Sequence, residues 1–493
     1  MDALPRDPYR PAQRIGLLLG GAAFLVMLLV PGPASLSVGG WRTAAVAVLM
    51  AAWWMTEALP ISATALLPLV LFPSLGVLSA PAASAPFANE LIFLFMGGFL
   101  IAGAMERWGL HKRIALAIMA WVGTRPDRLV LGFMLATGFL SMWISNTATA
   151  AMMLPIALAV GAMLKPPDLK GRPYHFGIAL MLGVAYAASL GGIATLIGTP
   201  PNAVLAGAAS EMLGRQVGFV EWLGVGVPVT LVMLPAAWLL LTRVLHPPGD
   251  LHGDAAAIIQ AERTALGAPT RGEKLTGLVF GLTALAWVLR SEKDLGGVVV
   301  PGIETWFPQV RDSTIAMGAG VLLFLLPADW RKGDFCLDWR TAAGIPWGVL
   351  VLFGGGLSLA VGMEESGLAA WIGGVVAALR GVPPWVVIGA VATLFVFLTE
   401  LTSNVAITSM AMPVMAGAAQ GLGLDPLLLM ATAALSASMA FMLPVATPPN
   451  AIVFSSGYLT IPQMARAGFL LNLTAIVVIT LLAGLLVPVF LGG

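Results

Sequence analysis

The sequence is poor in charge. Lys and Arg number 25 and Asp and Glu 24 among 493 residues, so 10% of the chain is charged, against about 25% in an ordinary soluble domain. Hydrophobic residues make up 59%, more than the interior of a soluble fold accommodates. This composition excludes a soluble globular enzyme, a disordered chain and a nucleic-acid-binding protein, and it favours a polytopic membrane protein.

Residues that build metal and redox sites are also scarce. A single cysteine, Cys336, excludes a disulfide framework and a thiolate metal cluster. No two of the four histidines have metal-ligand spacing on an apolar helix, and no nucleophile–base pair is evident. We therefore expect neither an enzyme nor an organic cofactor, and the net charge of +1 predicts no nucleic-acid partner.

Long apolar runs are abundant. Their length and continuity indicate membrane-spanning helices of about 20 residues rather than strands of a barrel. The candidate segments are 15–31, 41–57, 60–76, 89–108, 129–163, 175–208, 219–245, 273–290, 312–327, 342–375, 383–419, 426–457 and 467–490. The sequence predicts an all-α protein with about eleven transmembrane helices and two re-entrant hairpins.

The two hairpins are predicted where polar residues interrupt an apolar run. Segment 129–163 carries Ser145-Asn146-Thr147 in its middle, and segment 383–419 carries Ser403-Asn404. Segments 175–208 and 426–457 are instead interrupted by Thr-Pro-Pro-Asn. Because proline removes a backbone donor and clashes with the preceding turn, we expect both of these helices to be broken.

The distribution of positive charge sets an orientation. With a cytoplasmic N-terminus and both hairpins re-entrant, 19 of the 25 Lys and Arg fall inside the cell, in agreement with the positive-inside rule. The remaining six fall outside: Arg42, Arg215, Arg290, Lys293, Arg311 and Arg380. This topology places the protein in the cell (inner) membrane with its C-terminus outside.

The chain contains an internal repeat. Residues 94–110 and 352–368 share nine identities in 17 positions, and the same offset of 258 superimposes the two Ser-Asn motifs. An offset of 248 superimposes the two Thr-Pro-Pro-Asn motifs. Because the predicted topology runs the two copies in opposite directions, we expect inverted repeats with a substrate site at the membrane midplane.

These motifs have the chemistry of an anion site with accompanying cations. Helix N-termini, hydroxyls and amides bind oxyanions, and no Lys or Arg lies near the motifs in these four segments. A dianion would therefore enter together with Na⁺ or H⁺, and oxygen-rich side chains favour Na⁺. Glu400 is the carboxylate best placed for a direct role, although the sequence does not define that role.

These features together resemble the divalent anion/sodium symporter family of dicarboxylate, citrate and sulfate transporters. The resemblance rests on the paired Ser-Asn motifs, the two Thr-Pro-Pro-Asn loops, the stretch from Ala437 to Val453, and Trp53-Trp54-Met55-Thr56-Glu57-Ala58. It covers nearly the whole chain. One departure is Val405, where the second motif of the family often ends in threonine, and this leaves the preferred anion undetermined.

The resemblance implies a homodimer in the lipid bilayer that works by an elevator mechanism. Scaffold parts would comprise 1–123 and 273–380, each ending in an arm helix (110–123 and 367–380). Transport parts would comprise 124–245 and 381–493, and 246–272 would be a cytoplasmic linker.

The resemblance also implies the site residues. The implied substrate-binding residues are Ser145, Asn146, Thr147, Thr199, Pro200, Ser403, Asn404, Thr447 and Pro448. The implied sodium ligands are Ser141, Ser145, Asn146 and Gly198 in one site and Thr399, Thr402, Asn404 and Ala446 in the other. We expect sodium-coupled symport of C4-dicarboxylates (succinate, malate, fumarate) or related di- and tricarboxylates. A sodium-independent dicarboxylate exchanger, a sulfate or other oxyanion carrier, and an arsenite-type efflux protein remain alternatives.

Overall fold

A computed structural model describes residues 10–123, 125–166, 173–249, 255–294 and 299–492. The helices up to residue 245 are α1 (Pro11–Leu29), α2 (Val38–Thr56), α3 (Ile61–Thr64), α4 (Leu67–Ser74), α5 (Ala80–Ser84), η1 (Ala85–Ala88), α6 (Glu90–Arg107), α7 (Leu110–Val122), α8 (Pro126–Ser141), α9 (Asn146–Met163), α10 (His175–Ala194), α11 (Pro200–Leu213), α12 (Phe219–Leu239) and the π-helical η2 (Leu240–Leu245).

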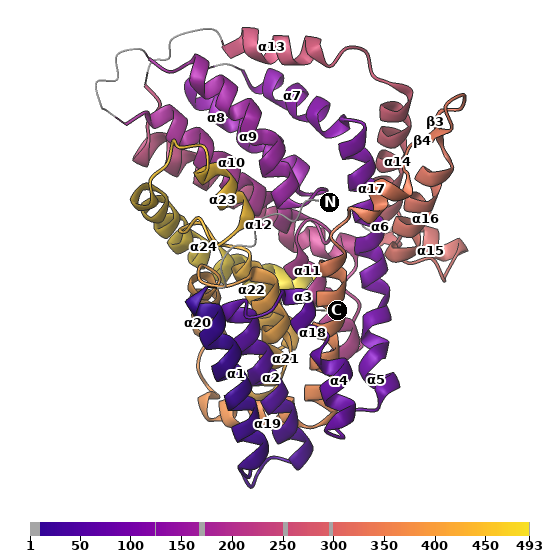
Figure 1. The fold of residues 1–493 in the computed structure, drawn as a ribbon, viewed down its shortest axis with the longest axis vertical. Coiled ribbons are helices and arrows are strands. Elements are labelled where there is room, and N and C mark those ends of the chain that lie inside the picture. The colour runs from indigo at the N-terminus through magenta and orange to yellow at the C-terminus, as the bar shows by residue number, and fades with distance from the viewer. Residues whose placement is uncertain (1–9, 124, 167–172, 250–254, 295–298, 493) are drawn as a thin grey trace.

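The helices of the second half are drawn from pink through orange to yellow in Figure 1. They are α13 (Ala255–Ala265), α14 (Arg271–Val288), α15 (Ile303–Trp306), α16 (Asp312–Leu325), α17 (Trp339–Ala343), α18 (Trp347–Glu365), α19 (Leu368–Val376), η3 (Ala377–Leu379), α20 (Pro384–Leu398), α21 (Asn404–Leu422), α22 (Pro426–Ala437), α23 (Pro448–Phe454) and α24 (Ile461–Phe490).

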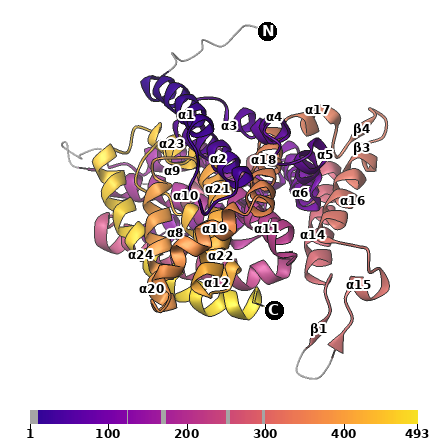
Figure 2. The same ribbon diagram turned by 90° about the horizontal axis from the view of Figure 1, so that it is seen from below.

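Two short antiparallel ribbons depart from the all-helical prediction. They pair β1 (Lys293–Asp294) with β2 (Val299–Val300), and β3 (Pro327–Asp329) with β4 (Asp334–Phe335). Both lie in connections between helices, the first between α14 and α15 and the second between α16 and α17. With α14 and α16 they form one edge of the molecule, opposite α20 and α24 (Figure 2).

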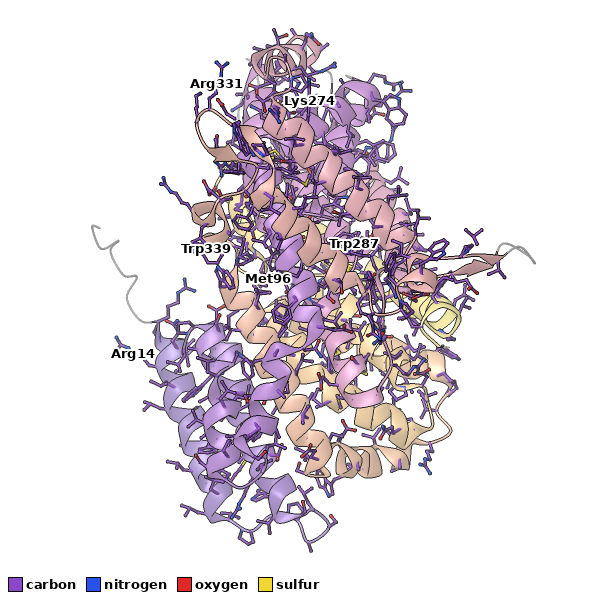
Figure 3. The ribbon with its side chains drawn as sticks, turned by 90° about the vertical axis from the view of Figure 1, so that its right-hand side faces the viewer. Arg14, Met96, Lys274, Trp287, Arg331 and Trp339 are labelled. Carbon is purple, nitrogen blue, oxygen red and sulfur yellow. The ribbon has the colours of Figure 1, made fainter. Side chains whose placement is uncertain are left out.

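Long apolar helices with exposed side chains identify a membrane protein. Among the described residues, eight helices are long and apolar enough to cross a bilayer, and five more apolar helices are shorter. Leu18 on α1 is 71% exposed and Leu481 on α24 is 66% exposed. Such continuous apolar surface is stable only against lipid or another protein. Figure 3 shows α14 from Lys274 at one end to Trp287 near the other.

The centre of the fold is built on helices of small residues. In α10 every residue from Phe176 to Ala194 is buried, and in α22 every residue from Leu427 to Ala437 is buried. Glycine permits the closest approach, because a Cβ at Gly191 would lie 2.1 Å from the carbonyl oxygen of Gly138 on α8. Helices α10 and α22 therefore form a close-packed core, and the polar motifs lie next to it.

Each polar-centred segment folds as two helices joined by a tight turn. Helices α8 and α9 meet at residues 142–145, and α20 and α21 meet at residues 399–403. A serine stands at the N-cap of the second helix in both cases, Ser145 before α9 and Ser403 before α21. Serine is favoured at this position because its hydroxyl can accept a hydrogen bond from a backbone N–H of the first turn. The Ser145 hydroxyl accepts from the Ala148 N–H at 3.3 Å, whereas the Ser403 hydroxyl makes no such capping bond.

The Thr-Pro-Pro-Asn motifs break their helices as predicted. The backbone leaves the helix between α10 and α11 and again between α22 and α23. In each case a threonine is the N-cap and proline fills the first helical position, where its missing N–H costs nothing. The unwound stretches are 195–199 and 438–447.

Several predicted segment boundaries differ from the structure. Segment 60–76 is divided into α3 and α4, and segment 342–375 is divided into the end of α17, all of α18 and nearly all of α19. The predicted linker 246–272 contains the helix α13, which Lys112 anchors to α7 by an ion pair of 2.8 Å with Glu262. Residues 250–254 of that linker lie outside the described residues.

Candidate functional site

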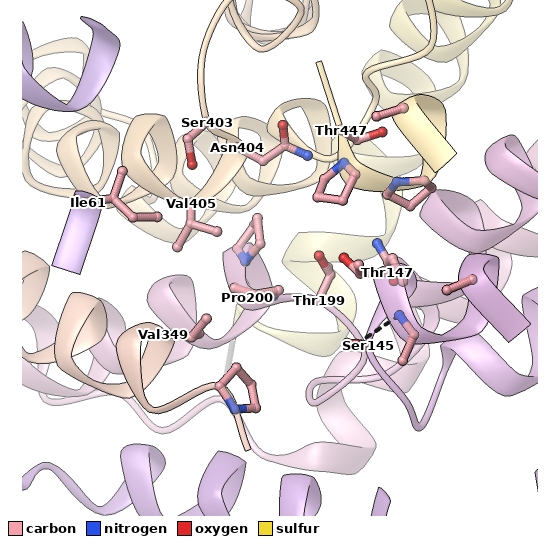
Figure 4. A pocket seen from close by; sticks show the side chains of 18 of the residues that line it. Ile61, Ser145, Thr147, Thr199, Pro200, Val349, Ser403, Asn404, Val405 and Thr447 are labelled. Carbon is pink, nitrogen blue, oxygen red and sulfur yellow. Dashed lines mark hydrogen bonds between the residues drawn. The ribbon is translucent and has the colours of Figure 1, made fainter. Parts of the chain in front are cut away.

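A cavity of about 1370 Å³ lies between the two hairpin turns and the two unwound loops. Its lining includes Ser145-Asn146-Thr147 and Ser403-Asn404 from the turns. The loops contribute Thr199-Pro200 and Thr447-Pro448 (Figure 4). Ser145 and Ser403, which lie 258 positions apart in the sequence, therefore face one shared cavity.

Four helices direct their N-termini at this cavity. Their N-cap residues are Ser145 for α9, Thr199 for α11, Ser403 for α21 and Thr447 for α23, and all four line the cavity. Helix N-termini carry partial positive charge, and those of α9 and α21 also have backbone N–H groups at their first positions. Helices α11 and α23 begin with two prolines, so they contribute the helix dipole without N–H groups at those positions. The convergence of the four N-termini produces an anion-binding environment without a lysine or arginine at the motifs.

The first hairpin turn holds a cluster of oxygen atoms behind the cavity wall. The Ser141 hydroxyl lies 2.7 Å from the Asn146 Oδ1 and 2.7 Å from the Ala188 carbonyl oxygen. A hydroxyl has one proton, so it can satisfy only one of these two acceptors at a time. An oxygen-rich cluster short of protons suits a hard cation.

The second hairpin turn repeats this cluster atom for atom. The Thr399 hydroxyl lies 2.6 Å from the Asn404 Oδ1 and 2.7 Å from the Ala437 carbonyl oxygen. Ser141 and Thr399 are both fully buried. The repeat seen in the sequence is thus a repeat of hydrogen-bonding geometry.

Asparagine side chains hold both unwound loops in shape. Asn202 donates to the Thr195 carbonyl at 2.8 Å, and Asn450 donates to the Leu443 carbonyl at 3.0 Å. Both asparagines are fully buried, and their Oδ1 atoms have no hydrogen-bond partner within the described part of the chain. Buried acceptors of this kind bind ordered water or an ion.

The structure brings the predicted residues together. All nine predicted substrate-binding residues line the cavity, as do the predicted sodium ligands Gly198, Thr402 and Ala446. Ser141 and Thr399 lie one layer behind, bonded to Asn146 and Asn404. The roles of these residues in binding stay predictions, because position alone does not assign a ligand.

Several cavity residues were not predicted from the sequence. Charged side chains come from helix ends outside the motifs: Arg10, Glu57, Glu106, Arg107 and Arg340. Glu57, which belongs to the stretch from Trp53 to Ala58 that supports the family resemblance, is the C-cap of α2 in a left-handed conformation with φ 50°. No local pattern marks these residues, because they reach the cavity only through packing of distant segments.

The arginines of the rim differ in their partners. Arg107 forms ion pairs with Asp334 at 2.5 Å and Asp338 at 2.6 Å. The backbone N–H and hydroxyl of Thr341, together with Arg107, hold the pKa of Asp338 below its usual range, so this pair persists at neutral pH. Arg340 is exposed and lines the cavity beside Thr341. The rim therefore carries charges of both signs, because Glu57 and Glu106 line it together with these arginines.

The two hairpin turns differ sharply in exposure. Trp143 at the first turn packs against Phe219 and Phe280, with ring centroids 6.0 and 5.0 Å away. Leu401, its counterpart 258 residues later, is 72% exposed and lines the cavity. The turn between α8 and α9 is therefore packed against α12 and α14, while the turn between α20 and α21 is exposed in the cavity.

The unwound loops show the same asymmetry. Ile197 is 7% exposed and lies against α6, where a Cβ on Gly98 would be 3.5 Å from its side chain. Val445, its counterpart 248 residues later, is 78% exposed in the cavity. The cavity is consequently closed on the side of the first repeat and open on the side of the second.

A polytopic helical protein with paired hairpins, broken helices and a central polar cavity has the architecture of a membrane transporter. Residues 12–491 match the family described as the sodium:sulfate symporter transmembrane region. The chain belongs to this family, which confirms the resemblance inferred from its motifs.

Curated relatives agree over the full length. The chain is 43% identical over 491 residues to the sodium-dependent dicarboxylate transporter SdcS of Staphylococcus saprophyticus, covering 98% of this chain and 93% of that protein. It is 41% identical over 498 residues to SdcS of Staphylococcus aureus, covering 99% and 94%.

Solved structures show the fold at greater distance. The YdaH transporter of Alcanivorax borkumensis superimposes with a TM-score of 0.59 at 16% identity, covering 97% of this chain and 98% of that one. MtrF of Neisseria gonorrhoeae, titled an antimetabolite efflux pump, gives a TM-score of 0.59 at 12% identity, covering 98% and 95%. At this identity the likeness concerns the fold alone.

Proposed function

We propose that the protein is a secondary active transporter that couples the movement of Na⁺ to the uptake of C4-dicarboxylates or related di- and tricarboxylates. The convergence of four helix N-caps on one cavity carries this proposal. A dicarboxylate has two negative ends, and the cavity offers one hydroxyl-and-amide motif from each hairpin to receive them. The relatives named sodium-dependent dicarboxylate transporters support the same substrate class.

Two sodium sites would occupy the oxygen clusters. The first comprises Ser141, Ser145, Asn146 and Gly198, and the second comprises Thr399, Thr402, Asn404 and Ala446. Because no lysine or arginine stands at the motifs, bound cations would offset the charge of a dianion at the cavity wall. Substrate binding and cation binding would therefore strengthen each other, which is the basis of coupling.

Uptake into proteoliposomes tests the proposal. Labelled succinate should accumulate when an inward Na⁺ gradient is imposed and should not accumulate with K⁺ in place of Na⁺. Unlabelled sulfate added in excess tests whether the site accepts a tetrahedral oxyanion instead. Equal succinate uptake with and without Na⁺ would reject sodium coupling, and exchange that persists in Na⁺-free medium would establish an exchanger.

We further propose inverted repeats divided into scaffold and transport parts, assembled as a homodimer with a cytoplasmic N-terminus and an outside C-terminus. The matching hydrogen bonds of the two hairpins support a repeat, and the distribution of Lys and Arg supports the orientation. Arg10, Arg107 and Arg340, which this orientation places inside the cell, all line the cavity. The conformation would thus be open to the cytoplasm.

Cysteine labelling from each side of the membrane should reveal this asymmetry. In a Cys336→Ser background, Val445→Cys should react with a membrane-impermeant maleimide from the cytoplasmic side at least about tenfold faster than Ile197→Cys, because reaction requires exposure. The two positions are repeat counterparts and serve as matched controls for one another. Equal rates, or faster labelling of Val445→Cys from the outside, would contradict the cytoplasmic opening.

The Val405 side chain provides a test of substrate contact. It occupies the repeat position of Thr147, and in Figure 4 it points toward the same part of the cavity as Ile61 and Val349. Val405→Thr replaces one methyl group with a hydroxyl and leaves the side chain nearly the same shape. One hydrogen bond from that hydroxyl to the substrate would contribute about 0.5–1.5 kcal/mol. The KM for succinate should therefore fall about two- to tenfold in the uptake assay. An unchanged KM for succinate and malate would remove position 405 from the substrate site.

A further inference from the structure

The Glu400 carboxylate lies buried at the turn between α20 and α21, where it is 3% exposed. Three consecutive backbone N–H groups of the unwound loop and one side-chain amide of α24 converge on it. The donors and their distances are Phe441 N at 2.7 Å, Met442 N at 2.9 and 3.0 Å, Leu443 N at 3.2 Å and Asn472 Nδ2 at 2.8 Å.

The hydrogen bonds around Glu400 favour its carboxylate form. A protonated carboxyl group would direct its O–H toward groups that are themselves donors, whereas a carboxylate accepts from all of them. Its four partner groups are neutral, so the negative charge is stabilised by hydrogen bonds without being cancelled by a cation. As a carboxylate, Glu400 would place one negative charge in the interior of the hairpin turn, held by hydrogen bonds alone.

Glu400 also connects the two chain segments that form the second oxygen cluster. It directly follows Thr399, whose hydroxyl contacts Asn404 and Ala437. Leu443, which donates to the carboxylate, accepts a hydrogen bond of 3.2 Å from the Ala446 N–H. The carboxylate thereby sets the position of the Ala446 carbonyl relative to the Thr399 hydroxyl.

The first repeat contains the same cluster without the charge. The residue 258 positions before Glu400 is Met142, and there the hydroxyl of Thr195 donates to the Met142 carbonyl. Both repeats therefore tie their hairpin turn to their unwound loop, one through a neutral hydroxyl and the other through a carboxylate. The two oxygen clusters agree in geometry and differ in electrostatics.

We infer that Glu400 is a positioning residue that makes the second oxygen cluster the tighter of two Na⁺ sites. The inference rests on the proposed sodium coupling and adds a ranking of the two sites. The Glu400 carboxylate is adjacent in sequence to Thr399 of the second oxygen cluster, and in the low-dielectric interior its charge attracts a cation bound there. The first repeat has Met142 at the corresponding position and lacks this attraction. The second site consequently fills first as Na⁺ rises.

The test measures Na⁺ binding apart from transport. Purified protein in detergent is titrated with NaCl at constant ionic strength, with choline chloride as the balancing salt, and the shift in melting temperature is recorded. Glu400→Gln should raise the half-saturating Na⁺ concentration about tenfold, whereas Glu400→Asp, which keeps the charge, should raise it much less. In proteoliposomes at saturating Na⁺, the KM of Glu400→Gln for succinate should stay near the wild-type value. A purely structural defect would raise this KM as well.

Equal effects of Glu400→Gln and Glu400→Asp on the half-saturating Na⁺ concentration would overturn the role of the charge. If Glu400→Gln does not fold, Thr399→Ala and Ser141→Ala replace it: Thr399→Ala should remove the tighter phase of the Na⁺ titration and Ser141→Ala the weaker one. The opposite assignment would overturn the ranking. Absence of any Na⁺-dependent stabilisation in the wild-type protein would instead reject the proposed sodium coupling.

Discussion

Replacing Asn146 or Asn404 with alanine is expected to reduce Na⁺-driven succinate uptake to background while the protein still inserts in the membrane with the oligomeric state of the wild type. Each asparagine lines the cavity and contacts a buried hydroxyl, Ser141 or Thr399, at 2.6–2.7 Å. Its Oδ1 would serve a cation on one side and its amide a carboxylate on the other. Loss of one oxygen ligand or its support costs about 10–100-fold in ion affinity, and the lost anion contact multiplies this effect.

A matched control is available within the second hairpin. Thr393 is exposed on α20 and donates to the Gly389 carbonyl of its own helix at 2.7 Å, so Thr393→Ala should transport at the wild-type rate. Membrane insertion and oligomeric state are compared by size-exclusion chromatography of all three variants. Near-normal uptake by either asparagine variant would remove the Ser-Asn motif from the mechanism.

Gly198→Ala is expected to have the second large effect. An added Cβ would lie 2.5 Å from the Gly192 carbonyl oxygen and 3.0 Å from the Ser141 carbonyl oxygen. These are backbone atoms of the packed core, so the clash must displace the unwound loop. Forcing a methyl group into such a site costs about 1–3 kcal/mol. Uptake at limiting Na⁺ should fall about tenfold or more.

The control for Gly198→Ala is Gly281→Ala on α14, where an added Cβ has no neighbour within 4 Å. This variant should transport and melt as the wild type does. Raising the Na⁺ concentration should partly restore uptake by Gly198→Ala, because the displaced loop weakens cation binding. A Gly198→Ala variant with wild-type Na⁺ dependence would exclude the Gly198 carbonyl as a sodium ligand.

The sequence predicted the local features of the site well, because their physical causes are local. Thr-Pro-Pro-Asn breaks a helix wherever it occurs in an apolar run, and both breaks appear between α10 and α11 and between α22 and α23. Ser145 and Ser403 stand at the N-caps of α9 and α21, a position that serine favours locally. Segment 60–76 was predicted less well, because hydropathy measures only apolar length and is blind to the turn that separates α3 from α4.

The rim of the cavity illustrates what the sequence left undetermined. Arg10 and Arg340 lie 330 positions apart and share no motif, yet both line the cavity. Glu57 and Glu106 occur at the C-terminal ends of α2 and α6, outside the Ser-Asn and Thr-Pro-Pro-Asn motifs. Only the packing of these helix ends around the hairpin turns assigns them to the cavity.

By itself, the sequence determined that this protein belongs in a membrane, that its chain carries two related halves, and that its polar chemistry is concentrated at four motifs. Hydropathy, proline and repeated residues suffice for this, because each acts over one helix or less. The tertiary structure decided that Trp143 is packed against aromatic side chains while Leu401 is exposed in the cavity. It also decided that Glu400 accepts hydrogen bonds from the unwound loop 438–447. These features depend on contacts between segments that are distant in the sequence. The repeated motifs predict that the two halves are alike, but in this conformation the two halves pack against different neighbours.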